Sequence, residues 1–311
     1  MHNTVAAIVV TYNRKEWLVE CLQALRVQSQ PVARIYIIDN ASTDGTADLL
    51  DVYGFMTDAQ CEYIRMEKNT GGAGGFHAGL SRAFTAGYEW FWLMDDDVEP
   101  FQDALGKLLS YQDRSGCIHG RRRNVDGTPV LWGYHFDPHT VTTTQICDLL
   151  FECNQEVQVV NVGCFEGMLI RRDVVAQIGF PKADLFICGD DTYYGYLASH
   201  VTPVLYVNVF SLRRKRSVET RESRLLRREI YKVGSLTQYY FQRNRFLIAR
   251  SIGSHSFSFA RASLVTLVKT MLWELMFFGS PKGALAALRG FIDGVKYFAT
   301  NPACDRSSCG R

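Results

Sequence analysis

Three consecutive acids, Asp95, Asp96 and Asp97, directly follow the apolar run of residues 90–94. Carboxylates this close repel one another, and the repulsion raises their pKa values unless a positive group joins them. A divalent cation with oxygen ligands meets that need, and Mn²⁺ or Mg²⁺ suits carboxylates that share the ion with phosphate oxygens. The triplet therefore predicts a metal site. The competing interpretation is an acidic turn that caps a helix, because Asp is favoured at helix N-termini.

A second acidic pair, Asp190 and Asp191, follows residues 185–189, an apolar run that ends in glycine. An apolar and aromatic setting can raise the pKa of one member of a carboxyl pair, which suits a general base. Either acid can also cap the helix expected over the next residues. The two roles are compatible, so position alone does not separate them.

A glycine-rich loop, residues 69–75, precedes a helix expected from about Phe76 to Ala86. Glycines at a helix N-terminus let backbone amides approach an anion, which makes Asn69, Gly71 and Gly72 candidates for binding a phosphate. The spacing is not that of a dinucleotide-binding fingerprint, and the loop follows the third expected strand rather than the first. A tight connector explains the loop equally well.

The elements that position these residues alternate in type over the first hundred residues. Apolar β-branched runs predict strands over residues 5–11, 34–39, 62–66 and 90–94, with helices between them. This alternation predicts an α/β fold with a parallel, doubly wound sheet. Such sheets bind ligands outside the carboxyl ends of their strands. Three groups of polar residues follow strands there: Thr11, Tyr12 and Arg14; Asp39; and the acid triplet.

The later part of the chain has a different pattern. The flanks of a turn at residues 126–129 and the run 157–162 favour strands of a mixed or antiparallel piece. A helix is expected over residues 225–250, and two amphipathic helices over 257–298, broken at Gly279-Ser280-Pro281.

The composition is that of a globular protein: 311 residues, 47% hydrophobic and 21% charged, with a net charge of +2. This excludes disorder, collagen-like repeats and a small disulfide scaffold. Residues 205–250 hold twelve Lys and Arg against three acids, a net +9, which leaves −7 for the rest. The basic stretch predicts a phosphate-rich partner. The competing interpretation, a solvated helical face, explains it only in part, because several arginines lack an acid one turn away.

Nine cysteines occur singly, which predicts structural thiols in a reducing compartment. The first residues do not read as a signal peptide, and the longest apolar stretch, residues 262–278, contains Lys269 and Glu274. It falls short of the roughly 20 apolar residues of a membrane span. We therefore expect a cytoplasmic protein that at most lies on a membrane surface.

Five motifs, in this order, resemble the inverting family 2 glycosyltransferases of the GT-A fold. They are VVTYNR, IIDNASTDGT, NTGGAGGFHAGL, FWLMDDD, and FEGMLIRRDVV with the later LFICGDDTYYGYL. The resemblance covers about Val5 to Leu197. It implies a catalytic GT-A domain over residues 1–210, a basic and helical C-terminal region over 211–300, and a polar tail over 301–311.

The resemblance also implies roles for residues. Asp95 and Asp97 would hold Mn²⁺ or Mg²⁺ on the diphosphate of a UDP-sugar donor, and Asp191, with Asp190 beside it, would be the base of a single inverting displacement. The donor-binding residues predicted in this way are Thr11, Tyr12, Arg14, Asp39, Asn69, Gly71, Gly72, Asp95 and Asp96. The family often adds a histidine to the metal, but residues 204–212 contain none, and His200 is expected at the surface.

Within the family, the closest resemblance is to galactofuranosyltransferases. Its marks are the paired glycines, the aromatic run before the acid triplet, and Tyr239-Tyr240-x-x-Arg243-Asn244, which rhamnosyltransferases share. It implies a UDP-galactofuranose donor and a surface-polysaccharide acceptor, such as an O-antigen precursor of lipopolysaccharide, linked to polyprenyl diphosphate. The alternatives are transfer of rhamnose or another hexose and, in a different class, a nucleotide-sugar or glycan-binding module without turnover.

The C-terminal helices leave two interpretations open. Their apolar residues, with Lys and Trp nearby, suit helices that lie in a membrane interface on the inner face of the cell membrane. They equally suit the core of the fold or the contact of a homo-oligomer. A nucleic-acid partner is not expected, because no nucleic-acid-binding module accompanies the basic stretch.

Overall fold

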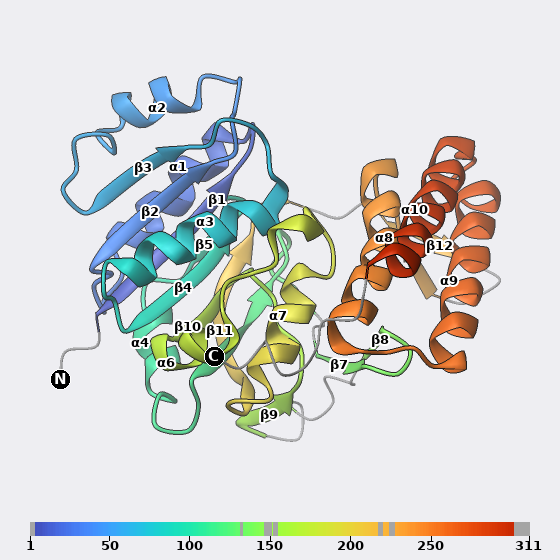
Figure 1. Cartoon of the computed structure of the whole chain (residues 1–311). Helices are drawn as coiled ribbons and strands as arrows, with labels where there is room; N and C mark the ends of the chain where they lie inside the picture. The colour runs from blue at the N-terminus through green and yellow to red at the C-terminus, as the bar shows by residue number, and fades with distance from the viewer. Residues whose placement is uncertain are drawn as a thin grey trace. The chain divides into compact units, whose positions relative to one another are not determined.

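The structure is a computed structural model that describes residues 4–130, 133–145, 151, 155–216, 220–223 and 228–301. The chain forms two compact units (Figure 1). Unit 1 comprises Met1–His135, Gln145–Phe186 and Asp190–Ser217, and unit 2 comprises Phe136–Thr144, Ile187–Gly189 and Val218–Arg311. Unit 2 therefore includes two short segments, 136–144 and 187–189, whose neighbours in the sequence belong to unit 1.

Unit 1 begins with the expected alternation of strands and helices. The elements are β1 (Val5–Thr11), α1 (Lys15–Arg26), β2 (Arg34–Asp39), α2 (Thr46–Val52), β3 (Cys61–Arg65), α3 (Gly71–Thr85) and β4 (Trp90–Asp95). The four strands are parallel, in the order β3-β2-β1-β4. Thr11 pairs with Asp39 on one side, and Val10 pairs with Asp95 on the other. The ends of β1, β2 and β4 therefore meet at one edge, as predicted.

The remaining strands of unit 1 make the sheet mixed. The elements are β5 (Val98–Pro100), α4 (Ala104–Leu109), β6 (Cys117–Arg123), β9 (Val157–Val160), β10 (Met168–Arg171), α6 (Arg172–Ile178), the 3₁₀ turn η1 (Ala183–Leu185), α7 (Asp190–Ala198) and β11 (Val204–Arg214). Antiparallel β10 joins β4 to β6, and β11 runs parallel to β6. Among the described residues this sheet has nine strands. Strand β11 continues past residue 210, where we placed a domain boundary.

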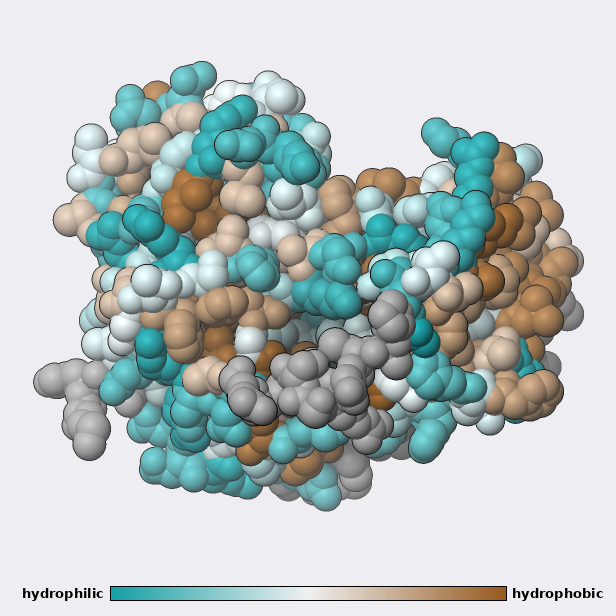
Figure 2. Space-filling view, viewed as in Figure 1, coloured by the Kyte–Doolittle hydropathy of each residue, from teal (hydrophilic) through white to brown (hydrophobic). Residues whose placement is uncertain are grey.

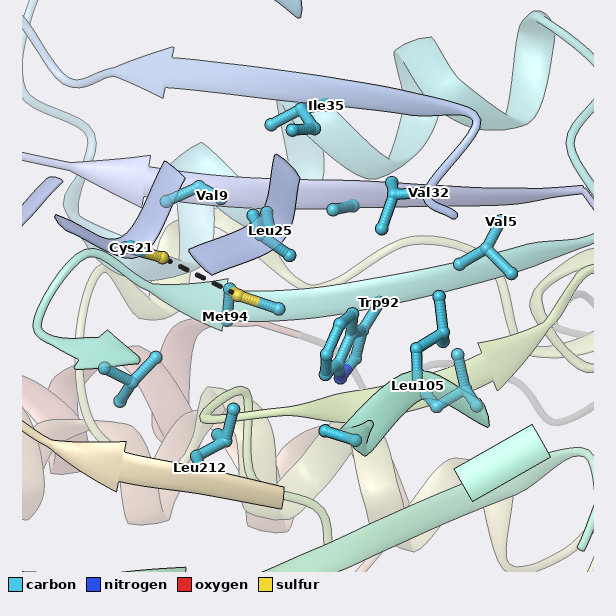
Figure 3. Close-up of a cluster of buried hydrophobic side chains, with 14 of the residues drawn as sticks. Val5, Val9, Cys21, Leu25, Val32, Ile35, Trp92, Met94, Leu105 and Leu212 are labelled. Atoms are coloured by element: carbon cyan, nitrogen blue, oxygen red, sulfur yellow. Dashed lines mark hydrogen bonds between the residues drawn. The ribbon is translucent and has the colours of Figure 1, made fainter. Parts of the chain in front are cut away.

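The core of unit 1 follows from the two-residue period of β1. Val5, Ala7 and Val9 face α1 and join Trp92 in a large buried cluster (Figure 3). The opposite face of the strand carries Ile8, against which α3 packs. Helices thus cover both faces of β1, which keeps all seven of its residues buried, and its polar residue, Thr11, lies at its end.

Helix α3 begins five residues earlier than predicted, at Gly71 instead of Phe76. The glycines lie inside the helix because they allow a close approach to the sheet. A Cβ atom at Gly75 would stand 2.5 Å from a methyl group of Val10, and one at Gly79 would stand 2.4 Å from a methyl group of Ile8. Packing therefore outweighs the low helix propensity of glycine.

Unit 2 is mainly helical. Its helices are α8 (Ser235–Ile252), α9 (Phe257–Met276) and α10 (Pro281–Thr300), and its short strands include β12 (Thr220–Ser223) and β13 (Arg228–Tyr231). The boundary with unit 1 falls inside two further short strands, β7 (Tyr134–Asp137) and β8 (Thr142–Gln145). The predicted helix over 225–250 is wrong in its first part, because β12 and β13 pair as an antiparallel ribbon and α8 starts after Gly234. The predicted break at 279–281 is confirmed: Ser280 caps α10, and Pro281 occupies its first turn.

Two further expectations concern the described residues only. No helix there combines the length and apolar character that crossing a membrane requires. The cysteines described, Cys21, Cys61, Cys117, Cys164 and Cys188, are all free thiols, as predicted. Cys304, Cys309 and most of the polar tail lie outside the described residues.

Candidate active site

The acid triplet lies where β4 ends, beside the end of β1. Asp96 is 1% exposed, and its carboxylate accepts hydrogen bonds from Thr11 Oγ1 at 2.7 Å and Arg14 Nη1 at 2.9 Å. The same Arg14 nitrogen lies 3.0 Å from Asp97 Oδ2. Two of the residues predicted to bind the nucleotide, Thr11 and Arg14, thus contact the acid triplet directly.

Burial dominates the electrostatics of the triplet. Desolvation, with repulsion from Asp97, raises the pKa of Asp95 well above its ordinary value. Desolvation also raises the pKa of Asp96 to about 6, although Arg14 opposes the shift. The pKa of Asp97 is raised as well, against the attraction of Arg14. The carboxyls are therefore held in a place that disfavours their charge, and a bound cation would relieve that cost.

Glu166 is a site residue that we did not predict. Its Oε2 accepts hydrogen bonds from Arg122 Nη1 at 2.8 Å and from Arg214 Nη2 at 2.7 Å and Nε at 2.9 Å. Burial would raise its pKa, but the two arginines hold the pKa below the usual value. The charge of Glu166 also acts on Asp95, Asp97 and Asp191. Glu166 therefore lies within electrostatic range of both acidic groups.

Asp190 and Asp191 occupy the first turn of α7. Burial and the neighbouring Asp191 raise the pKa of Asp190 to about 8. Burial also raises the pKa of Asp191, while hydrogen bonds from Thr192 oppose the shift. Asp191 Oδ1 accepts a hydrogen bond from the amide of the next residue, Thr192, at 2.6 Å, within the first turn of α7. At neutral pH the pair favours a single shared negative charge.

Asp39 is buried completely, and its carboxylate is already engaged. It accepts hydrogen bonds from Tyr63 Oη at 2.6 Å, Arg65 Nη1 at 3.2 Å and the Ser42 amide at 2.7 Å. Tyr12, at the end of β1, is 43% exposed. Of these two predicted nucleotide-binding residues, Tyr12 presents its ring to solvent, whereas Asp39 organises the turn after β2.

At the start of α3, two backbone amides donate hydrogen bonds to groups outside the helix. Asn69 Oδ1 accepts from the Gly71 amide at 2.8 Å, and the Ala73 amide donates to the Phe186 carbonyl at 3.1 Å. Gly71 has a φ of +71°, and a Cβ atom there would lie 2.0 Å from the Phe186 oxygen. Nothing lies within 4 Å of a Cβ atom placed at Gly72. Gly71 is thus required by packing, and Gly72 faces open space.

The structure also places the histidine and the first part of the basic stretch. His200 is exposed just past α7, as expected. No group of three or more His, Cys, Asp or Glu side chains that could hold a metal occurs in the part of the chain described. Arg213 pairs with Glu99 at 2.7 Å, and Lys215 pairs with Glu20 at 2.6 Å. These acids are distant in sequence, so they escaped an analysis of local spacing. Residues 217–219 and 224–227 lie outside the description.

The acid triplet and Glu166 lie within a match to a known protein family, which ends before the acidic pair at 190 and 191. Residues 6–179, more than half of the chain, match the family model described as Glycosyl transferase family 2. The chain belongs to glycosyl transferase family 2. This family 2 chain is 31% identical over 197 residues to the galactofuranosyltransferase GlfT1 of Mycobacterium tuberculosis. That match covers 61% of this chain and 63% of GlfT1, so less than two thirds of the relative is spanned.

Solved structures give the fold of this family 2 chain independently. S. aureus TarS 1-349 in complex with UDP has a TM-score of 0.53 at 14% identity, covering 96% of this chain and 92% of that one. GalNAc-T7 with UDP, GalNAc and Mn²⁺ has a TM-score of 0.59 at 15% identity, covering 95% and 55%. The GT-A fold predicted from the sequence is thereby confirmed.

Proposed function

We propose that this chain transfers galactofuranose from UDP-galactofuranose to a hydroxyl of a surface-polysaccharide acceptor linked to polyprenyl diphosphate. One observation carries the proposal. The charge of Glu166 acts both on Asp95, at the end of β4, and on Asp191, at the start of α7, so the two acidic groups belong to one site. Family membership supports glycosyl transfer, and the GlfT1 similarity supports the sugar. Rhamnose from dTDP-rhamnose is the alternative that a donor screen decides.

Asp95 and Asp97 are the residues that would hold Mn²⁺ or Mg²⁺. The fit rests on their chemistry: buried carboxyls with raised pKa values are oxygen donors whose ionised form a cation would stabilise. Such an ion, when bound, supplies positive charge for the leaving diphosphate. Arg14, which already contacts Asp97, would add a fixed guanidinium beside the same phosphates.

Asp191 would act as the general base. Burial raises the pKa of both acids, which favours one negative charge on the pair, and we assign that charge to Asp191. The acceptor oxygen forms a bond to the anomeric carbon while its proton passes to Asp191. The bond from that carbon to the diphosphate oxygen breaks, and its electron pair leaves with UDP. A single backside displacement of this kind inverts the anomeric centre.

Helix α9 supports association with a membrane surface, where a lipid-linked acceptor resides. Figure 2 shows apolar side chains gathered over the C-terminal helices. Exposed apolar residues of α9 are Phe257, Leu264, Val265, Val268, Leu272, Leu275 and Met276. Arg261 and Lys269 are exposed on the same helix, whereas its acid, Glu274, is buried. An apolar and basic face suits anionic lipid.

The experiment measures UDP release from UDP-galactofuranose, dTDP-rhamnose and other nucleotide sugars, with water or a polyprenyl-diphosphate-linked saccharide as acceptor. Asp191→Asn should lower the rate constant at least about a hundredfold, because general-base contributions are typically of that size. Asp184→Asn is the matched control, since Asp184 is half exposed and lies seven residues before Asp191. Equal rates for the wild type and Asp191→Asn would refute the catalytic assignment.

A further inference from the structure

The backbone just before the acidic pair is strained. Phe186, Cys188 and Gly189 have positive φ angles of 63°, 72° and 80°. Phe186 combines its φ with a ψ of −64°, the rarer and strained form of γ-turn. Each non-glycine residue in such a conformation costs on the order of 1–3 kcal/mol and persists only where its surroundings fix it. The chain passes from this turn directly into Asp190 and Asp191.

One side chain of α8 holds this turn within unit 2. Asn244 Nδ2 donates hydrogen bonds to the carbonyl oxygens of Ile187 and Cys188, both at 2.8 Å. Asn244 is 1% exposed, so these bonds are shielded from water. Both amide hydrogens are directed at two consecutive carbonyls, which fixes the peptide planes of the turn.

Arg243 in turn orients Asn244. Its Nε and Nη2 lie 3.0 Å and 2.7 Å from Asn244 Oδ1, so the amide oxygen faces a guanidinium and the amide nitrogen faces the turn. The Arg243 guanidinium also stacks over the Tyr240 ring, 4.5 Å from its centre. The residues of the Tyr-Tyr-x-x-Arg-Asn signature are thus connected physically to residues 187 and 188.

We propose that Arg243 and Asn244 are positioning residues for the acidic pair. They hold the carbonyl groups of residues 187 and 188, and so fix the turn that immediately precedes Asp190 and Asp191 in the chain. The inference rests on the proposed function, since it assumes that Asp191 is the base. Misplacing a reacting group by about 1 Å can cost about a hundredfold in rate, so a turn that relaxes would reduce kcat more than donor binding.

The test compares Asn244→Ala and Asn244→Asp with Gln238→Ala. Asp keeps the shape of Asn and its contact with Arg243 but cannot donate to two carbonyls. Gln238 is a matched control, because it is a buried amide on the same helix whose Nε2 bonds to Glu274 at 2.6 Å, away from the turn. Both Asn244 variants should lower kcat about ten- to a hundredfold and change the donor KM less than about twofold. Gln238→Ala should leave both constants within about twofold.

Hydrogen exchange provides a readout that does not depend on turnover. Amides of residues 187–191 should exchange faster in both Asn244 variants than in the wild type, and at the wild-type rate in Gln238→Ala. Unchanged exchange there, or a kcat loss no greater than in the control, would overturn the positioning role. If the wild type transfers sugar from no nucleotide donor, the proposed function fails instead, and exchange still decides whether Asn244 holds the turn.

Discussion

Replacing Glu166 by Gln removes one charge from the centre of the site and keeps the shape of the side chain. Arg122, 1% exposed, loses a carboxylate partner at 2.8 Å, and Arg214 loses two bonds to the same oxygen. The buried Arg122 charge would then lose its carboxylate partner and keep its contact with Cys164 Sγ at 2.7 Å. We expect Glu166→Gln to destabilise the chain substantially.

The magnitude follows from two opposing effects. Breaking a buried ion pair by removing one partner costs about 3–5 kcal/mol. Against this, Glu166 repels Asp95, Asp97 and Asp191, and the substitution relieves that repulsion. The glutamine oxygen also still accepts one hydrogen bond. We therefore expect a net loss of about 2–3 kcal/mol in the free energy of unfolding.

Urea unfolding followed by tryptophan fluorescence measures this loss. Asp173→Asn is the matched control, because Asp173 accepts two bonds from Arg171, at 2.7 and 2.9 Å, in a pair whose side chains are 38% and 55% exposed. An exposed pair should contribute less than about 1 kcal/mol. A loss in Glu166→Gln no larger than in Asp173→Asn would refute the reasoning. Adding Arg122→Met to Glu166→Gln should recover part of the loss, since it removes the buried positive charge that Glu166 no longer balances.

Four further predictions follow from the same structure. The pKa of Asp190 is raised to about 8, so the folded chain holds a proton that the unfolded chain releases near pH 4. The free energy of unfolding should therefore fall as the pH rises from about 4 to about 8, by at most about 1.4 kcal/mol per pH unit. In Asp190→Asn the melting temperature should depend less on pH over the same range. Gly71→Ala should cost about 1–3 kcal/mol in thermal unfolding, because of its φ and its contact with the Phe186 oxygen; Gly72→Ala should be neutral or stabilising. Asp97→Ala should abolish the Mn²⁺ dependence of donor binding in calorimetry, and unchanged affinity would reject the metal assignment. Leu272→Ser should weaken sedimentation with anionic vesicles; binding that ignores anionic lipid, or a stable dimer in size-exclusion chromatography, would favour the oligomer interpretation instead.

The parallel half of the fold could be predicted because its signals are local. The strand bounds of β1 and β2 agree with the prediction, since a buried parallel strand is a short continuous apolar run bounded by polar residues. The same logic placed Thr11, Asp39 and the acid triplet at one edge of the sheet. The start of α3 could not be found in this way, because it is close contact with β1 that explains the helical glycines at positions 75 and 79.

Other features depend on partners that are distant in the sequence. Glu166 bonds to Arg122 and Arg214, which are 44 and 48 residues away, and no local pattern indicates such a pair. The same holds for Asn244, whose partners are 56 and 57 residues away. The sequence revealed a recurring signature at Arg243 and Asn244 without indicating its role. Burial patterns therefore predict elements, whereas the polar contacts that organise a site require coordinates.

The balance of charge around the acid triplet gives a reason to expect that a cation binds together with the diphosphate of the donor. Four acids lie there, and four guanidinium groups act on them: Asp95, Asp96, Asp97 and Glu166 with Arg14, Arg122, Arg214 and Arg216. If all four acids are ionised, the group carries no net charge, and a diphosphate would bring two negative charges into a place where burial already disfavours charge. The arginines are already balanced by the four acids, so they leave those two charges without a counter-charge. A dication would return the group to zero net charge, and binding of the ion and of the diphosphate should therefore be mutually favourable.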